Sequence, residues 1–432
     1  MAPPTSIDPR SDGYTRTRAA MQSLLDELRA RHEQVLGDSG ERHDLRRRDP
    51  GELAPRERID LLLDSDSPFL ELGALAGWDT PDPLGGGLVL GIGIVEGVEC
   101  LVLADDGAAS GSAASPTAVA KARRGHELAL RNRLPLLQLL EPRASERFDP
   151  DAAPGPDRAA FRELAELESA GVPTIAVVFG PSTVATTPLA DLSEHTIVVA
   201  PPEVRGRRDR IDGADELAAD DVDGVRLARQ VVRNLNWRPR VDAERRITGP
   251  LLDADELLGI PSADEPSAVD VREVIWRIVD DSHLDEFKPF TGPSLVTGWA
   301  SVCGHPVGIV ATNGPLLLDE SDKGAQFVRR CSARDVPILF VQDHPGSPSG
   351  TDLVRAVAGS TVPHLTLLIG PGDAGDDAMA TGAYRPRFVF SWPNHRLTAD
   401  ELGRHHWDDA VIDPRDTRVV LGIALTCIHA GR

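Results

Sequence analysis

The first candidate for chemistry is a stretch of small residues, Gly107–Ser115, that leads into a helical pattern with three basic side chains. Backbone N–H groups of such a loop, at the N-terminus of a helix, can bind an anion such as a phosphate group. The alternative is an ordinary surface turn, because short loops rich in Gly and Ser are common. The residues predicted to bind the anion are Gly107, Gly111, Ser112, Lys121, Arg123 and Arg124.

Four charged residues follow the apolar run 134–140. Glu141 and Glu146 could form a carboxylate pair that transfers protons. Arg143 and Arg147 stand beside them, and this mixture of signs is typical of an ordinary ion-pair network. We favour the ion-pair interpretation.

The histidines give no strong candidate. His344 at a strand end could act as a general acid or base, or activate Ser347 or Ser349, but a surface histidine in a turn rich in Pro and Gly is the simpler interpretation. His405 and His406 are neighbours, and adjacent residues on a helix point to different faces. We therefore predict no metal site.

The composition disfavours several classes of protein. The net charge of −22 argues against nucleic acid as a partner, because the surface as a whole would repel phosphates. No uncharged apolar run reaches the roughly 18 residues that a membrane span needs, and the first residues lack the apolar core of a signal peptide. The four cysteines lie far apart, without the spacing of a metal site. We expect a cytoplasmic protein.

The two halves of the chain repeat one order of elements, and this repeat predicts the architecture. Each half has a hairpin, a helix, two strands that open with an apolar residue and proline, a further strand and a closing helix. We predict that the first hairpin turns at Glu96-Gly97 and the second at Gly304-His305. Lys121 and Lys323 occupy equivalent places. The corresponding long helices are predicted over Thr117–Arg133 and Glu320–Asp335 after the hairpins, and over Asp223–Leu235 and Asp416–Cys427 at the ends.

Strands that alternate with helices predict a layered α/β core in each half. Before the first half, the apolar spacing between Met21 and Leu28 indicates a helical arm, and residues 1–12 are expected to be disordered. We assign residues 1–64 to an N-terminal tail and helical arm, 65–240 to the first half, 241–268 to a linker and 269–432 to the second half.

Several longer segments carry a resemblance to a known family. They are 56–64 (RERIDLLLD), 68–74 (PFLELGA), 269–275 (VDVREVI), 286–289 (EFKP), 292–298 (GPSLVTG) and 409–418 (DAVIDPRDTR). Together they resemble the carboxyltransferase β-subunits of biotin-dependent acyl-CoA carboxylases over almost the whole length of the chain.

This resemblance implies two tandem crotonase (ClpP/crotonase-like) domains of the ββα-superhelix type. It also implies an active site where the first half of one chain meets the second half of another, in a hexamer built as a trimer of dimers. The implied reaction transfers a carboxyl group from carboxybiotin to the α-carbon of an acyl-CoA or acyl-carrier-protein thioester. Biotin would be carried by a partner biotin carrier protein and charged by a biotin carboxylase, so no covalent cofactor is expected on this chain. The loop Gly107–Ser115 matches the family's CoA-binding position.

The family's chemistry needs two oxyanion holes made of backbone N–H groups. Its first hole is written Asp-Ser-Gly-Gly-Ala-Arg, whereas this sequence has Glu141-Pro142-Arg143-Ala144, where both glycines are lost and Pro142 has no N–H. The second, biotin-side hole is better kept, with one glycine of its pair retained. The residues assigned to the second hole are Gly346, Ala374, Gly375 and Asp376, and those assigned to the altered first hole are Glu141, Arg143 and Ala144.

Three functions remain open on the sequence. The first is a carboxyltransferase subunit that works with biotin. The second is a decarboxylase of malonyl- or methylmalonyl-thioesters, or a related acyl-thioester enzyme, that needs no biotin. The third is a non-catalytic relative that assembles with an active carboxyltransferase.

Overall fold

The computed structural model describes residues 3–46, 52–78, 80–106, 115–141, 157–179, 188–200, 213–237, 246–260, 270–343, 351–370, 379, 384–396 and 408–430. Contacts divide the chain into two compact units. We call Arg31–Val241 with Cys427–Arg432 the first-half unit, and Met1–Ala30 with Asp242–Thr426 the second-half unit. The helix α1 (Asp12–Arg46) contributes residues to both.

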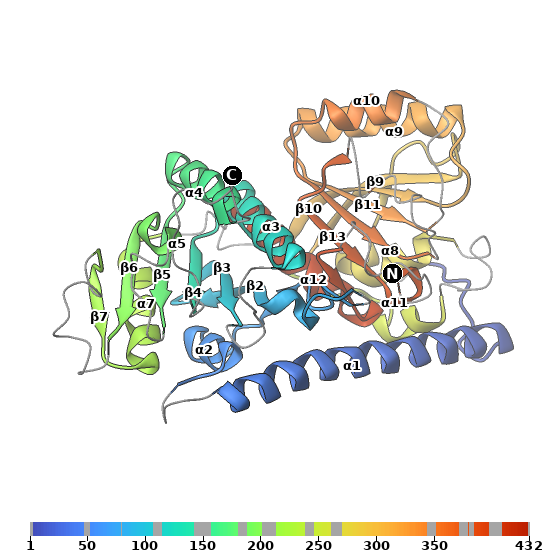
Figure 1. Ribbon diagram of the computed structural model, residues 1–432. Coiled ribbons are helices and arrows are strands. Elements are labelled where there is room, and N and C mark those ends of the chain that lie inside the picture. Colours follow the sequence, from blue (N-terminus) through green and yellow to red (C-terminus); the bar gives the residue numbers. More distant parts are fainter. Residues whose placement is uncertain are drawn as a thin grey trace. The chain divides into compact units, whose positions relative to one another are not determined.

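Each unit contains one seven-stranded sheet whose strands lie in sequence order (Figure 1). The first sheet consists of β1 (Leu70–Leu72), β2 (Leu88–Val95), β3 (Val98–Asp105), β4 (Leu136–Leu140), β5 (Thr174–Val178), β6 (His195–Val199) and β7 (Glu216–Ala218). The second consists of β8 (Asp285–Glu286), β9 (Leu295–Val302), β10 (His305–Thr312), β11 (Ile338–Gln342), β12 (His364–Leu368), β13 (Phe388–Ser391) and β14 (Ala410–Val411). In both sheets the first three strands pair antiparallel and the remaining strands continue in parallel.

Helices cover these sheets in the order that the repeat predicts. The first-half unit has α2 (Pro55–Leu62), α3 (Pro116–Asn132), α4 (Asp157–Ser169), α5 (Pro188–Asp191) and α7 (Asp221–Asn234). The second-half unit has the 3₁₀ segment η3 (Ala254–Gly259), α8 (Arg272–Ile278), α9 (Leu318–Ala333), α10 (Thr351–Ala358), α11 (Pro393–Arg396) and most of α12 (Thr417–Ala430). The predicted hairpins, post-hairpin helices and closing helices are confirmed.

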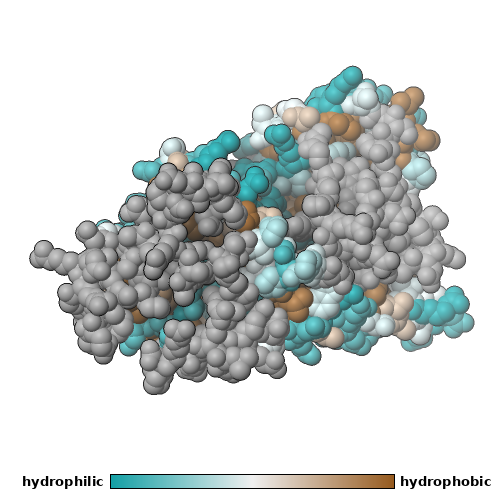
Figure 2. Space-filling model, viewed as in Figure 1, coloured by the Kyte–Doolittle hydropathy of each residue, from teal (hydrophilic) through white to brown (hydrophobic). Residues whose placement is uncertain are grey.

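Alternate residues of the strands face opposite helix layers, as the strand period of two requires. A Cβ on Gly125 of α3 would meet Leu90 and Leu101, while one on Gly224 of α7 would meet Val199 and Val177. In the second-half unit, α9 and α10 lie together along one side of the sheet (Figure 1). The outward side chains of α1 between Asp12 and Leu36 are largely hydrophilic (Figure 2). In the ranges described above, no helix is long and apolar enough to cross a membrane.

One arrangement, which we call the turn clamp, holds the hairpin turn in each unit. In the first-half unit the carboxylate of Asp64 accepts hydrogen bonds from the N–H groups of Glu96 and Gly97, at 3.0 and 2.9 Å. Arg229 of α7 donates to the same carboxylate at 2.8 Å. Glu96 and Gly97 both have positive φ, as the predicted two-residue turn requires.

The turn clamp of the second-half unit corrects one prediction. Its carboxylate is Asp280, which accepts from the N–H groups of Cys303 and Gly304 at 3.1 and 2.8 Å, and Arg418 of α12 donates to it at 2.6 Å. Cys303 and Gly304 carry the positive φ values, 50° and 77°. The turn therefore lies one residue before the predicted Gly304-His305, and His305 begins β10.

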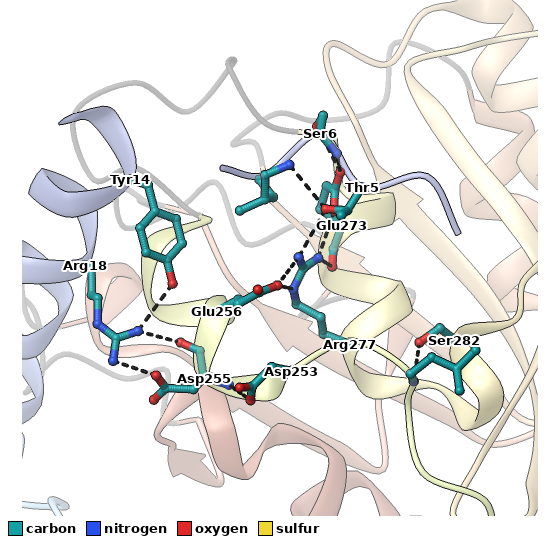
Figure 3. Close-up of polar contacts among 12 residues, drawn as sticks. Thr5, Ser6, Tyr14, Arg18, Asp253, Asp255, Glu256, Glu273, Arg277 and Ser282 are labelled. Carbon is teal, nitrogen blue, oxygen red and sulfur yellow. Dashed lines mark hydrogen bonds and ion pairs between the residues drawn. The ribbon is translucent and has the colours of Figure 1, made fainter. Parts of the chain in front are cut away.

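The expected disorder of residues 1–12 is also wrong for the residues that the structure describes. Thr5 and Ser6 donate hydrogen bonds to the carboxylate of Glu273 in α8, at 2.8 Å from Thr5 Oγ1 and 2.6 Å from the Ser6 N–H (Figure 3). The tail is thus fixed by a partner more than 260 residues away, which no local pattern could indicate.

Candidate active site

The carboxyl ends of the parallel strands β3, β4 and β5 meet at one edge of the first sheet, where ligands of open α/β sheets commonly bind. Asp105 ends β3, Glu141 follows β4 and Phe179 follows β5. The Glu141 N–H donates to Asp105 Oδ2 at 3.4 Å, and the Phe179 N–H donates to Leu140 O at 2.9 Å. These bonds fix where the chain leaves the sheet.

The second sheet repeats this edge with different side chains. The Asp343 N–H donates to Thr312 Oγ1 at 2.8 Å, and the Ile369 N–H donates to Gln342 O at 2.9 Å. Gly370 follows, and a Cβ built on it would lie 1.6 Å from Asp343 O. Only glycine can therefore occupy position 370 while the ends of β11 and β12 approach so closely.

A buried arginine organises the edge of the first sheet. Arg58 of α2 is 2% exposed, and its Nη1 donates to Glu141 Oε2 at 2.8 Å. Its Nε donates to Oδ2 of the buried Asp221 at 3.0 Å, and its guanidinium carbon lies 3.9 Å from the centre of the Phe179 ring. Asp221 Oδ2 also accepts from the N–H of Leu53. Of the sequence-predicted site residues, the structure thus places Glu141 at this edge.

Lys121 points away from solvent and serves the scaffold in this structure. Its Nζ is buried and donates to Gly85 O and Leu88 O at 3.1 and 2.6 Å. The equivalent Lys323 donates to Gly292 O and Leu295 O at 3.3 and 2.7 Å. Both amines hold the backbone that leads into the hairpin, so the anion-binding role predicted for Lys121 is not available in this conformation.

Lys121 should give the protein a distinctive alkaline pH dependence. Burial lowers its pKa from 10.5 to about 8. Between these values the unfolded chain binds more protons than the folded chain, so this group makes the free energy of unfolding rise with pH. Relative to a Lys121→Met variant, the wild-type protein should therefore gain stability on the order of 3 kcal/mol from the lower to the upper end of this window.

Urea denaturation at several pH values across that window measures the gain. Lys323→Met should give a difference of the same sign, because burial also lowers the pKa of Lys323. Parallel stability curves for wild type and Lys121→Met would contradict the assignment of Lys121 as a buried cation.

Arg123 and Arg124 lie on α3 and are engaged with carboxylates. Arg123 pairs with Glu163 at 3.4 Å and its side chain is 62% exposed. Arg124 pairs with Glu127 at 2.9 Å and is less exposed. Their predicted role in anion binding is untested and would require them to exchange these partners.

The other predicted site residues lie outside the described residues. These are Gly107, Gly111 and Ser112 of the loop, Arg143 and Ala144 of the altered first hole, and Gly346, Ala374, Gly375 and Asp376 of the second hole. Their roles remain predictions. Within the described ranges, no group of three or more His, Cys, Asp or Glu side chains is arranged to hold a metal ion.

The chain is built of two α/β units, each with one seven-stranded sheet of the same strand order. This tandem arrangement is that of the carboxyltransferase fold. The carboxyl transferase domain family matches residues 46–203 and 211–399, and the chain belongs to this family.

Named relatives extend the match to the whole chain. A probable biotin-dependent acyl-coenzyme A carboxylase beta2 subunit of Mycobacterium tuberculosis is 36% identical, covering 99% of this chain and 97% of that protein. A probable mitochondrial methylcrotonoyl-CoA carboxylase beta chain of Drosophila melanogaster is 32% identical, covering 98% and 92%. The crystal structure of the geranyl-CoA carboxylase beta subunit of P. aeruginosa superposes with a TM-score of 0.86 at 31% identity, covering 100% of this chain and 98% of that one.

These comparisons confirm the predicted family, the tandem crotonase-type fold and the enzyme class of the carboxyltransferases. They do not favour the decarboxylase or the non-catalytic relative. Arg58 was not predicted as a residue of this edge, because 83 residues separate it from Glu141. A comparison of the two halves would have found it, since Arg56 of α2 corresponds to Arg272 of α8, and Arg58 then corresponds to the apolar Val274.

Proposed function

We propose that this chain transfers a carboxyl group between biotin, carried by a partner protein, and the acyl chain of a coenzyme A thioester. The observation that supports the proposal is the 36% identity to an acyl-CoA carboxylase beta2 subunit over 99% of this chain and 97% of that relative. The carboxyl group moves from a biotin nitrogen to an acyl carbon, and one proton moves in the opposite direction, so atoms balance. We place this activity in the cytoplasm.

We further propose a branched, unsaturated acyl group as the substrate class. The relatives named for methylcrotonoyl-CoA share 30–33% identity with this chain, and the subunit named for geranyl-CoA shares 31%. Relatives named for propionyl-CoA share 27–28%. This order of sequence identity favours a branched, unsaturated acyl group over propionyl as the substrate.

The chain's own residues would divide the work between its two halves. The loop Gly107–Ser115, with Arg123 and Arg124, would hold the CoA phosphates, while Lys121 keeps its place in the scaffold. On the biotin side, Gly346 and Ala374–Asp376 would supply backbone N–H donors. What supports this assignment is that Gly370 and Asp343, the last described residues before these two segments, lie against each other, so the two segments start side by side.

The altered first hole should make turnover slow. Loss of one oxyanion-hole donor costs about 10²- to 10³-fold in rate. Here Pro142 lacks an N–H and both family glycines are replaced. We therefore expect biotin-dependent turnover well below that of a family member with an intact first hole.

As partners we propose a biotin carboxylase and a biotin carrier protein, within a hexamer of this chain or of this chain with a homologue. Membership of the carboxyl transferase family supports this assembly. Size-exclusion chromatography coupled to light scattering would measure the mass of the purified assembly.

The experiment that tests the proposed function follows thioester masses by mass spectrometry. The purified chain is incubated with malonyl-CoA, methylmalonyl-CoA and the carboxylated forms of methylcrotonoyl-CoA and geranyl-CoA, with and without free biotin. We expect loss of the carboxyl group only when biotin is present, and fastest from the unsaturated thioesters.

Each other outcome selects a different function. Loss of the carboxyl group without biotin would identify a decarboxylase. No turnover of any thioester, with or without a biotin carrier protein, would identify a non-catalytic assembly partner and overturn the proposal.

A further inference from the structure

Among the residues that the structure describes, three contacts recur at corresponding places in the first-half and second-half units. At both edges the residue after the second parallel strand donates its N–H to a side chain of the preceding strand, Asp105 in one case and Thr312 in the other. At both edges the residue after the next strand, Phe179 or Ile369, donates its N–H to the carbonyl of the last residue of the neighbouring strand, Leu140 or Gln342. The helices α2 and α8 also start alike, each with a bidentate ion pair to the first strand: Arg56 with Glu71, and Arg272 with Glu286.

The two units differ at the residue two positions further along these helices. In α2 it is Arg58, 2% exposed, and in α8 it is Val274, 1% exposed. The second-half unit therefore fills this position with an apolar side chain. A buried arginine with two carboxylates has a desolvation cost that its ion pairs often fail to exceed, so stability alone does not account for it.

Arg58 holds the side chain of Glu141 in a fixed position. An apolar residue at the place of Arg58, like the Val274 of the second-half unit, could not do so. Asp221 and the Phe179 ring hold the guanidinium from two sides, at 3.0 Å and 3.9 Å, which leaves Nη1 directed at Glu141 Oε2 at 2.8 Å. Asp221 is itself fixed by the Leu53 N–H at 2.9 Å. Glu141 is 30% exposed, so its carboxylate is held at the surface of the strand edge, where the altered first hole begins.

We propose that Arg58 is a positioning residue of the first-half site, acting through Glu141 on the bound acyl-thioester. The inference rests on the proposed function, because the thioester is the ligand that the first-half edge would take. In the family pattern two glycines bring backbone N–H groups close to the thioester oxygen. The family's segment itself begins with a carboxylate, Asp, and Glu141 keeps a carboxylate at this place. Arg58 clamps that carboxylate, and the clamp fixes Glu141, the first residue of the segment.

The proposal is tested with three single variants and with the double variant that combines Glu141→Gln and Arg58→Lys. Glu141→Gln removes the charge that Arg58 holds but leaves the Arg58–Asp221 pair intact, so it should fold. Arg58→Lys keeps the positive charge, but one ammonium cannot hold two carboxylates in the planar geometry of a guanidinium. Arg56→Met is the matched control, because it breaks an equally bidentate ion pair on the same helix that does not reach the strand edge.

Two readouts are compared at equal concentrations of folded protein. One is kcat/KM for the most reactive carboxylated thioester with biotin, and the other is the Kd of that thioester by calorimetry. We expect Glu141→Gln and Arg58→Lys each to lower kcat/KM by about 10²-fold and to weaken binding, and the double variant to be no worse than either. Arg56→Met should stay within about threefold of wild type.

The outcomes separate this inference from the proposed function. Glu141→Gln indistinguishable from Arg56→Met, or losses that add in the double variant, would overturn the positioning role. If wild type binds the thioester but shows no turnover, the proposed function fails, and the Kd values alone decide the role of Arg58. If wild type neither binds nor turns over any thioester, both proposals are wrong.

Discussion

Replacing Arg277 with methionine should destabilise the protein by about 3–5 kcal/mol, because it leaves a buried carboxylate without its counter-charge. Arg277 is 0% exposed, and its Nη1 donates to Glu273 Oε2 at 2.8 Å (Figure 3). Its Nε also donates to Glu256 at 3.0 Å. The side chain of Glu273 is only 3% exposed, so water cannot replace the lost arginine.

The free energy of unfolding from urea denaturation measures this effect, and Arg18→Met provides the control. Arg18 pairs with Asp255 in the same unit, but both side chains are more than one third exposed. Such a pair contributes about 1 kcal/mol or less. If both variants lose the same free energy of unfolding, the buried ion pairs of Arg277 stabilise the protein no more than the exposed Arg18–Asp255 pair does.

The second large effect is expected at Gly370. An alanine there would place its Cβ 1.6 Å from Asp343 O and 2.9 Å from Asp343 Oδ1, so the ends of β11 and β12 must separate. We expect Gly370→Ala to cost at least about 3 kcal/mol of stability, at the upper end for overpacking. It should also abolish biotin-dependent carboxyl transfer, because the segments assigned to the second hole start at these strand ends.

Gly249→Ala is the matched control, since a Cβ at position 249 meets no atom of the described chain within 4 Å. Thermal unfolding and the thioester assay are measured on both variants. A Gly370→Ala protein as stable and active as Gly249→Ala would contradict the close approach of the two strand ends.

The order of elements was predictable because it rests on local signals that occur twice. The first turn at Glu96-Gly97 follows from a glycine with positive φ between apolar runs. The second turn was misplaced by one residue because Gly304 fits either register. What selects Cys303-Gly304 is the carboxylate of Asp280, more than 20 residues earlier in the chain.

The candidate site was less predictable, because its contacts join distant segments. Lys121 follows a loop suited to phosphate, yet its amine turns inward to Gly85 O and Leu88 O. Sequence spacing gives the helix that carries a lysine but not the direction of its side chain. For the same reason the tail residues Thr5 and Ser6 gave no sign of their partner Glu273.

The turn clamps also bear on how the chain folds during synthesis. Asp64 and Arg229 are 165 residues apart, and Asp280 and Arg418 are 138 residues apart. Each clamp closes an early hairpin with the last helix of its half, and contacts of such high sequence separation form slowly. A ribosome must therefore release nearly the whole of each half before the arginine completes its clamp, whereas the bonds from Asp64 or Asp280 to the turn join residues at most 33 apart. Until the half is complete, its nascent strands expose pairing edges, and such edges favour aggregation.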